Sequence, residues 1–175
     1  MPDLKIKGFA AMSAGATLTP ITYETPPLNA DEVRIDITHC GICGSDIQAI
    51  DDVYSAFDFP FVPGHEVVGH ISEVGSAVPR SRLGERVGVG WQGRACGHCE
   101  WCRAGEVQLC MDVTSNGTWT PHGGFSSSIA VSDGFAYPLP EGLASEDAAV
   151  LMCAGLTVYT ALARHYNPSA NKIGI

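Results

Sequence analysis

Four cysteines lie on one short stretch of the chain with a spacing that suits a metal ion. Cys96, Cys99, Cys102 and Cys110 follow the pattern Cys-x2-Cys-x2-Cys-x7-Cys. Small gaps let one loop wrap a single ion, and four thiolates in tetrahedral geometry are common ligands of structural zinc. Iron–sulfur clusters also use cysteine-rich loops, but the x7 gap and the lack of a following proline depart from the bacterial ferredoxin pattern. The spacing therefore predicts a closed zinc site.

A second set of possible metal ligands is spread along the chain. Cys43, His65, Glu66 and Cys153 are far apart in sequence, so their spacing says little. Taken singly, each cysteine is more often a buried core thiol. Two cysteines and one histidine would hold zinc with a fourth position open, as catalytic zinc requires. One closed site and one open site together are typical of a zinc enzyme that also carries a structural zinc.

Composition and charge limit the number of domains, the partners and the compartment that can be expected. The chain has 175 residues, 45% of them hydrophobic, which is enough for one core. The net charge of -9, without a basic cluster, disfavours nucleic acid or an anionic membrane as partner. The start lacks an apolar signal core, and no apolar run is expected to reach the roughly 20 residues that span a bilayer. We therefore expect a cytoplasmic protein whose seven cysteines are ligands or buried thiols and do not form disulfides.

Short β-type segments broken by Gly and Pro predict a mainly β fold, a barrel or compact sandwich with a few helices. The expected strands are 4–12, 17–23, 31–39, 67–78, 85–90, 125–131 and 135–140. A short helix should begin after Cys43. A longer helix is expected from about Glu146 to His165, with Ser145 as N-cap and a bend or division at Gly155. Residues 172–175 have the pattern of another strand.

Several blocks together resemble one known family. They are the Gly-His-Glu block at 64–78, the Gly-Ile-Cys block at 41–46, the four-cysteine loop, the double glycine at 122–125 and Cys-Ala-Gly-Leu-Thr at 153–157. In this order they resemble the zinc-containing alcohol dehydrogenases of the medium-chain dehydrogenase/reductase superfamily. The last two blocks are most similar to the cinnamyl alcohol dehydrogenase-like branch. The resemblance covers essentially the whole chain.

The resemblance implies a domain organisation. Residues 1–144 would form a GroES-like β-barrel catalytic domain that carries two zinc ions. Residues 145–175 would be a helical connection and the first residues of a truncated Rossmann domain, which is otherwise absent. We expect such an N-terminal fragment to be nearly inactive alone and to self-associate through the apolar face after Ser145, and the full-length protein to be a homo-oligomer.

The resemblance also assigns roles to residues of the open site. Cys43, His65 and Cys153 would be ligands of the catalytic zinc, and Glu66 an intermittent ligand that can displace water. Asp46 would orient His65.

Four further positions concern the substrate and the cofactor. Ser45 would hydrogen-bond the alcohol and start its proton toward solvent, Trp91 would line the substrate pocket, and Thr157 would lie against the nicotinamide. In many members a histidine five residues after the first zinc cysteine ends the proton relay. Here that residue is Gln48, which cannot carry a proton.

The predicted function is a zinc-dependent oxidoreductase that transfers hydride between a primary alcohol or aldehyde and NADP or NAD. The alternative is a zinc-binding structural or interaction module without catalysis. Charge argues against a nucleic-acid-binding zinc ribbon, and the presence of both ligand sets argues against a zinc-independent quinone reductase of the same superfamily.

Overall fold

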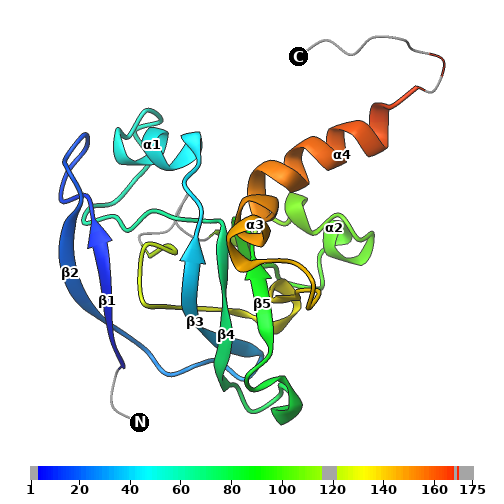
Figure 1. The fold of residues 1–175 in the computed structure, drawn as a ribbon, viewed down its shortest axis with the longest axis horizontal. Helices are drawn as coiled ribbons and strands as arrows, with labels where there is room; N and C mark the ends of the chain where they lie inside the picture. Colours follow the sequence, from blue (N-terminus) through cyan, green and yellow to red (C-terminus); the bar gives the residue numbers. More distant parts are fainter. Residues whose placement is uncertain (1–3, 116–121, 168, 170–175) are drawn as a thin grey trace.

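The computed structural model describes residues 4–115, 122–167 and 169, and the expected strand at 172–175 lies outside them. The largest sheet contains five antiparallel strands in the order β8 (Ser128–Ser132), β3 (Glu32–Cys40), β4 (Val67–Val74), β5 (Arg86–Val89) and β9 (Tyr137–Pro138). Two smaller antiparallel sheets pair β1 (Leu4–Ala10) with β2 (Thr19–Thr25), and β6 (Gln92–Arg94) with β7 (Thr114–Ser115). Figure 1 shows the β1–β2 pair set beside the main sheet. The prediction of a mainly β chain is confirmed, and no doubly wound parallel sheet occurs within the described ranges.

The core lies in the main sheet, where apolar residues alternate along the strands. Val33, Ile35, Val67, Val87 and Val89 are fully buried. Register shifts in the β3–β4 ladder, between positions 34 and 35 and between 37 and 39, mark bulges of the kind that bend a sheet. The alternation predicted for residues 31–39 is therefore confirmed. The strand expected to run to residue 78 ends at Val74, because a turn follows in which Val78 N donates to Gly75 O at 3.0 Å.

Short helices connect the strands. They are α1 (Gly44–Ile50), α2 (Glu100–Arg103), α3 (Ser145–Val150) and α4 (Leu156–His165), with a π-helical segment (Leu151–Gly155) between the last two. Single 3-10 turns occur at Arg80–Arg82, Val107–Leu109 and Asp133–Phe135. The helix expected to begin with Ser145 as N-cap instead has Ala144 in that position, without a side-chain cap. Ser145 is the first helical residue, and its Oγ accepts a hydrogen bond from Arg86 Nη1 at 3.0 Å.

The helical segment Ser145–His165 is long and apolar enough to cross a membrane by length and composition, so the expectation that no segment approaches this limit is wrong here. In the first half of this segment, apolar residues pack against the main sheet. Ala148 and Ala149 are buried with Val68 on the sheet. From Leu156 onward the helix projects from the body of the molecule (Figure 1), and Leu156 itself is exposed.

The β5 region makes room for this helical segment through its repeated Val-Gly pattern. Val87 and Val89 point into the core. A Cβ at Gly88 would lie 2.4 Å from Met152 Sδ, and one at Gly90 would lie 2.8 Å from Met152 O. The two glycines therefore allow the π-helical backbone to approach β5 closely.

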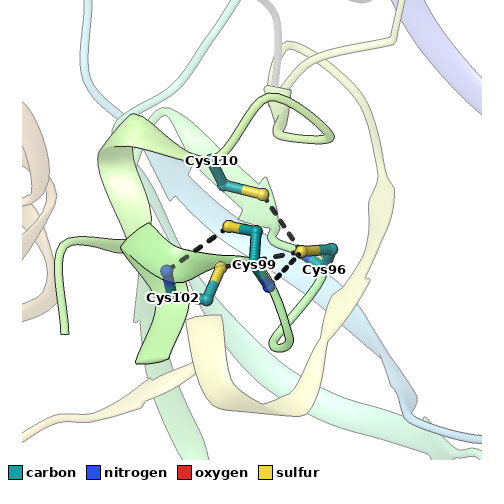
Figure 2. Close-up of side chains that lie close together, drawn as sticks. All are labelled: Cys96, Cys99, Cys102 and Cys110. Atoms are coloured by element: carbon teal, nitrogen blue, oxygen red, sulfur yellow. Dashed lines mark hydrogen bonds between the residues drawn. The ribbon is translucent and has the colours of Figure 1, made fainter. Parts of the chain in front are cut away.

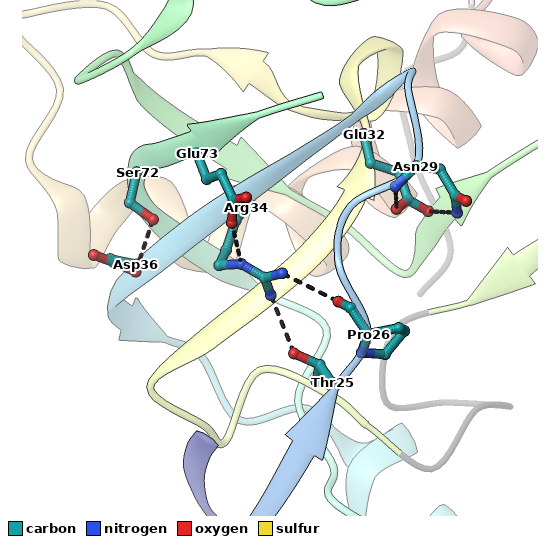
Figure 3. Close-up of polar contacts among 8 residues, drawn as sticks. All are labelled: Thr25, Pro26, Asn29, Glu32, Arg34, Asp36, Ser72 and Glu73. Carbon is teal, nitrogen blue, oxygen red and sulfur yellow. Dashed lines mark hydrogen bonds and ion pairs between the residues drawn. The ribbon is translucent and has the colours of Figure 1, made fainter. Parts of the chain in front are cut away.

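Arg34 ties the β1–β2 pair to the main sheet (Figure 3). Its side chain lies on β3, is only 3% exposed, and pairs with Glu73 of β4 at 3.0 Å. The guanidinium also donates to Thr25 Oγ1 at 3.3 Å and to Pro26 O at 3.4 Å, at the end of β2. One buried cation thus supplies hydrogen bonds to three residues on two segments, β4 and the end of β2.

We expect Arg34→Ala to lower the free energy of unfolding by about 2 kcal/mol. The substitution removes charge-assisted hydrogen bonds, which contribute about 1.5–3 kcal/mol when buried, and Glu73 is exposed enough to be rehydrated. Urea denaturation followed by circular dichroism would measure the change. Ser72→Ala, which removes the exposed Ser72–Asp36 hydrogen bond seen in the same view, is the control and should change stability by less than about 0.5 kcal/mol. Equal effects of the two substitutions would contradict this role for Arg34.

Candidate metal centres

The four cysteines of the short motif converge on one point (Figure 2). The ligand atoms of Cys96, Cys99, Cys102 and Cys110 all lie within 4.8 Å of one another. The Cys96 and Cys102 sulfurs are 3.9 Å apart. Thiolates bound tetrahedrally at about 2.3 Å from a shared zinc would be roughly 3.8 Å apart. The structure therefore places these sulfurs at the separation that zinc requires, and all seven cysteines of the chain are free of disulfides.

Backbone N–H groups of the loop point at these sulfurs. Cys99 N donates to Cys96 Sγ at 3.3 Å, Cys102 N to Cys99 Sγ at 3.4 Å, and Cys96 N to Cys110 Sγ at 3.3 Å. Such donors stabilise negative charge on sulfur. The loop turns tightly because these sulfurs accept N–H groups from its own backbone, with α2 beginning directly after Cys99.

The electrostatics of the four thiols also fit a dication. Hydrogen bonds from the backbone N–H groups of His98 and Cys99 lower the pKa of Cys96 to about 6. Burial, followed by the sulfur of Cys99, raises the pKa of Cys102 to about 12. Thiols this close cannot all ionise unless a cation balances their charge. This donor set therefore fits zinc.

The second ligand set comes together from three separate parts of the fold. Cys43 is the N-cap of α1, His65 and Glu66 immediately precede β4, and Cys153 lies in the π-helical segment. Their ligand atoms lie within 4.8 Å of one another, although the residues are separated by up to 110 positions. π-Helical turns occur frequently at functional sites. Here the turn carries one member of the set.

Asp46 holds two of these parts in place. Its carboxylate is 1% exposed and accepts hydrogen bonds from Cys43 N at 2.8 Å and Gly64 N at 2.9 Å. Its Oδ1 also lies 3.0 Å from Nδ1 of the buried His65. Burial acts to lower the pKa of His65, but the hydrogen bond and negative charge of Asp46, together with the contribution of Cys43, outweigh this effect and the pKa is raised. Because Nδ1 is engaged, Nε2 is the nitrogen left to bind a metal.

The remaining members differ in their preferred protonation state. Burial acts to raise the pKa of Cys43, yet hydrogen bonds from Ser45 and His65 lower it overall. Burial and the neighbouring Cys43 raise the pKa of Cys153 to about 12, and burial raises that of Glu66. One thiol whose ionisation is favoured, next to two acids that resist ionisation, is an arrangement that a bound dication would complete. This donor set also fits zinc.

A pocket of about 240 Å³ opens beside this second set. His65 and Cys153 form part of its wall, and the other lining residues are Ser45, Gln48, Tyr54, Phe57 and Trp91. Ser45 and Trp91, to which the family resemblance assigns roles at the substrate, are thus both among the lining residues. Thr157 is exposed on α4 and is not among the lining residues. A larger cavity of about 840 Å³ lies between the β1–β2 pair and β3, and none of the eight ligand residues lines it.

Tyr54 and Phe57 are pocket residues that the sequence analysis missed. They follow α1 on a loop in which Asp52 Oδ1 accepts the N–H groups of Ala56 at 2.9 Å and Phe57 at 3.2 Å. The Tyr54 hydroxyl donates to Gln48 Oε1 at 3.3 Å. Two aromatic residues in a Ser- and Asp-rich loop are a signal that could have been noticed. Their placement against the pocket follows only from the folded loop.

Comparison with known proteins agrees with this geometry. Residues 29–141 match the alcohol dehydrogenase GroES-like domain family. A probable cinnamyl alcohol dehydrogenase of Eucalyptus globulus is 42% identical over 164 residues, covering 90% of this chain and 46% of the relative. An NADP-dependent alcohol dehydrogenase C of Mycolicibacterium smegmatis is 38% identical, covering 95% and 50%. The chain thus spans about half the length of the curated relatives it matches.

Solved structures show the same likeness. A cinnamyl alcohol dehydrogenase from Sorghum bicolor superposes with a TM-score of 0.85 and 37% identity, covering 92% of this chain and 48% of the other. The crystal structure of CAD from Helicobacter pylori, complexed with NADP(H), gives a TM-score of 0.86 and 32% identity, with coverage of 93% and 49%. The chain therefore belongs to the alcohol dehydrogenase family with a GroES-like domain, the family that its metal-ligand motifs resemble.

Proposed function

We propose that this chain is the zinc-binding catalytic part of an oxidoreductase that interconverts a primary alcohol and its aldehyde with NADP or NAD. The observation that carries the proposal is the convergence of Cys43, His65, Glu66 and Cys153 beside a pocket. The names of the relatives, several of them cinnamyl or NADP-dependent alcohol dehydrogenases, support the same reaction. Residues 1–144 would be the catalytic domain and 145–175 the connection to the cofactor domain.

The two metal sites have different proposed roles. Cys96, Cys99, Cys102 and Cys110 would bind a structural zinc, because four sulfurs fill its coordination shell. Cys43, His65 and Cys153 would bind a catalytic zinc, with Glu66 as an intermittent ligand. Bound there, zinc would supply Lewis acidity that lowers the pKa of an alcohol hydroxyl, and a nicotinamide cofactor would supply the hydride acceptor.

The residues around the pocket would orient the substrate and remove its proton. Ser45 Oγ, 3.8 Å from Cys43 Sγ, would accept the hydrogen bond of the alcohol hydroxyl and start its proton toward solvent. Gln48 cannot accept and pass on this proton, so the proton would leave through water or a hydroxyl group of the cofactor. Trp91 and Phe57 supply flat apolar walls, which suit aromatic aldehydes. Thr157 on α4 would face the nicotinamide.

The proposal includes a cellular compartment and an oligomeric state. Seven free cysteines support a reducing compartment, the cytoplasm. The exposed apolar residues of α4, among them Val158 and Tyr159, support coverage by a cofactor domain or self-association, and the full-length protein would be a homo-oligomer.

We expect His65→Ala in the full-length protein to lower the reduction of cinnamyl and benzyl aldehydes by about a thousandfold or more. A bound Lewis acid contributes several kcal/mol to such a reaction, and the variant should lose one of two zinc equivalents. Oxidation of NADPH or NADH, read by absorbance, would measure the rate of aldehyde reduction, and elemental analysis would measure the zinc content. His70→Ala, which removes an exposed histidine of β4, is the matched control and should retain the activity and both zinc equivalents. A wild-type protein that holds two zinc ions but reduces no alcohol or aldehyde pair would reject the proposed reaction and favour a structural zinc module.

A further inference from the structure

The Glu66 carboxylate occupies a space that exists only because residue 41 is glycine. Glu66 is 2% exposed, and its backbone oxygen accepts the Gly41 N–H at 2.9 Å. A Cβ built on Gly41 would lie 2.0 Å from Glu66 Oε2 and 3.0 Å from Glu66 Cβ. Gly41 does not have the positive φ that favours glycine. The reason for a glycine here is therefore space for the carboxylate.

The same carboxylate contacts the helical segment on its other side. Its ligand oxygen lies within 4.8 Å of Cys153 Sγ in the π-helical turn, and the backbone N–H of Ala154, the next residue, acts to lower its pKa. A buried carboxyl group needs polar partners of this kind, because an unpaired polar group in a buried position is costly. Glu66 thus links the strand that follows it, β4, to the turn that carries a distant metal ligand.

This link lies close to the last buried contacts of the helical segment. Met152 rests against β5 through Gly88 and Gly90, whereas Leu156, immediately after the turn, is exposed. Further along, α4 makes an exposed ion pair between Arg164 and Glu106 at 3.7 Å. The contacts at residues 152 and 154 are therefore the ones that act most directly on the position of Cys153.

We propose that Gly41 is a positioning residue for the metal site: by leaving room for the Glu66 carboxylate against the Ala154 N–H, it sets Cys153 at ligand distance from Cys43 and His65. The inference rests on the proposed catalytic zinc site. It assigns Glu66 a mechanical task in addition to any direct contact with the metal.

A pair of glycine substitutions tests this. Gly41→Ala places a methyl group on the carboxylate, whereas Gly44→Ala, three residues away, meets nothing within 4 Å and has the same change in side chain. In the full-length protein we expect Gly41→Ala to weaken zinc binding at the open site by about ten- to a hundredfold, the range for residues that orient ligands. Gly44→Ala should bind two zinc ions as wild type does.

Two measurements give the readout without any assay of activity. Competition with a chelator, followed by elemental analysis, reports the affinity of each site, and the four-cysteine site serves as an internal standard for folding. Alkylation by iodoacetamide, located by peptide mass spectrometry, reports the exposure of Cys153. In Gly41→Ala, Cys153 should react while Cys96 and Cys110 stay protected. Unchanged affinity together with a protected Cys153 would overturn the inference.

A double-mutant cycle separates steric displacement of Glu66 from general damage. In a Glu66→Ala background the 2.0 Å clash with the carboxylate is gone and only the 3.0 Å contact with the Cβ of residue 66 remains, so Gly41→Ala should have a much smaller further effect on zinc affinity. An equal loss in both backgrounds would overturn the proposal.

If Gly41→Ala does not fold, Glu66→Gln and Glu66→Ala decide the matter. The glutamine keeps an oxygen for the Ala154 N–H and should leave Cys153 protected from alkylation, whereas the alanine should expose Cys153. Wild-type protein with only one zinc would instead refute the proposed catalytic site itself.

Discussion

Replacing Asp46 with alanine should both destabilise the protein and release the metal from the open site. The carboxylate accepts N–H groups from Cys43 and Gly64 and holds Nδ1 of His65, all in a nearly water-free environment. Removing one partner of a buried charged network leaves the others unpaired, which lowers stability by about 3–5 kcal/mol. Losing the group that orients a metal-bound histidine weakens metal binding by about ten- to a hundredfold. Urea denaturation and zinc competition would measure the two effects.

The same helix supplies a control for this result. Asp51 lies at the C-terminal end of α1 with an exposed side chain, so Asp51→Ala should change neither quantity appreciably. Asp46→Asn keeps one carbonyl oxygen but not the charge, and it should fall between wild type and Asp46→Ala in stability. Wild-type zinc affinity in Asp46→Ala would mean that His65 is oriented by other contacts.

Replacing Cys99 with serine should abolish zinc binding at the four-cysteine loop and loosen the chain around it. Apparent zinc-binding energies at such sites are about 10–16 kcal/mol, and much of this energy orders the loop. Three of its four cysteines are only partly buried, and one part-buried side-chain contact from outside, Gln92 Nε2 to Val107 O at 2.9 Å, joins the loop to β6. Hydrogen exchange of residues 95–113 should therefore become much faster, while β3 and β4 retain their protection.

The control for this experiment is a cysteine outside both ligand sets. Cys40 is half-buried at the end of β3, and its sulfur belongs to neither group of converging ligand atoms. Cys40→Ser should keep both zinc equivalents and normal exchange in the loop. Anomalous scattering that identified iron, or a disulfide among the four cysteines, would refute the zinc assignment.

Local patterns allowed much of the molecule to be predicted. The four-cysteine loop was readable because its ligands fall within 15 consecutive residues, and β3 was readable because Val33 and Ile35 alternate with polar neighbours. The open site was harder. Nothing near Cys43 in sequence indicates Cys153, and only the resemblance to a known family joined them before the structure brought them together.

Other features depend on tertiary contacts, often between residues far apart in sequence, which no local pattern indicates. Tyr54 reaches the pocket through a loop in which Asp52 and Ser55 adopt left-handed backbone angles, with φ of 51° and 50°. Ser145 does not cap its helix because Arg86, 59 residues earlier, engages its hydroxyl. The small size of Gly41 matters only because Glu66, 25 residues later, fills the space beside it.

The two ligand sets also differ in when the growing chain can assemble them. The cysteines of the loop are separated by 14 residues at most, whereas Cys43 and Cys153 are separated by 110. Closing the longer loop carries an extra entropic penalty of about 2 kcal/mol, and its last ligand is made only after every strand of the sheets has been synthesised. The four-cysteine loop can therefore capture its ion as an early, independent event. Occupancy of the open site is a late event, and it reports that the barrel has formed and the C-terminal helix has docked.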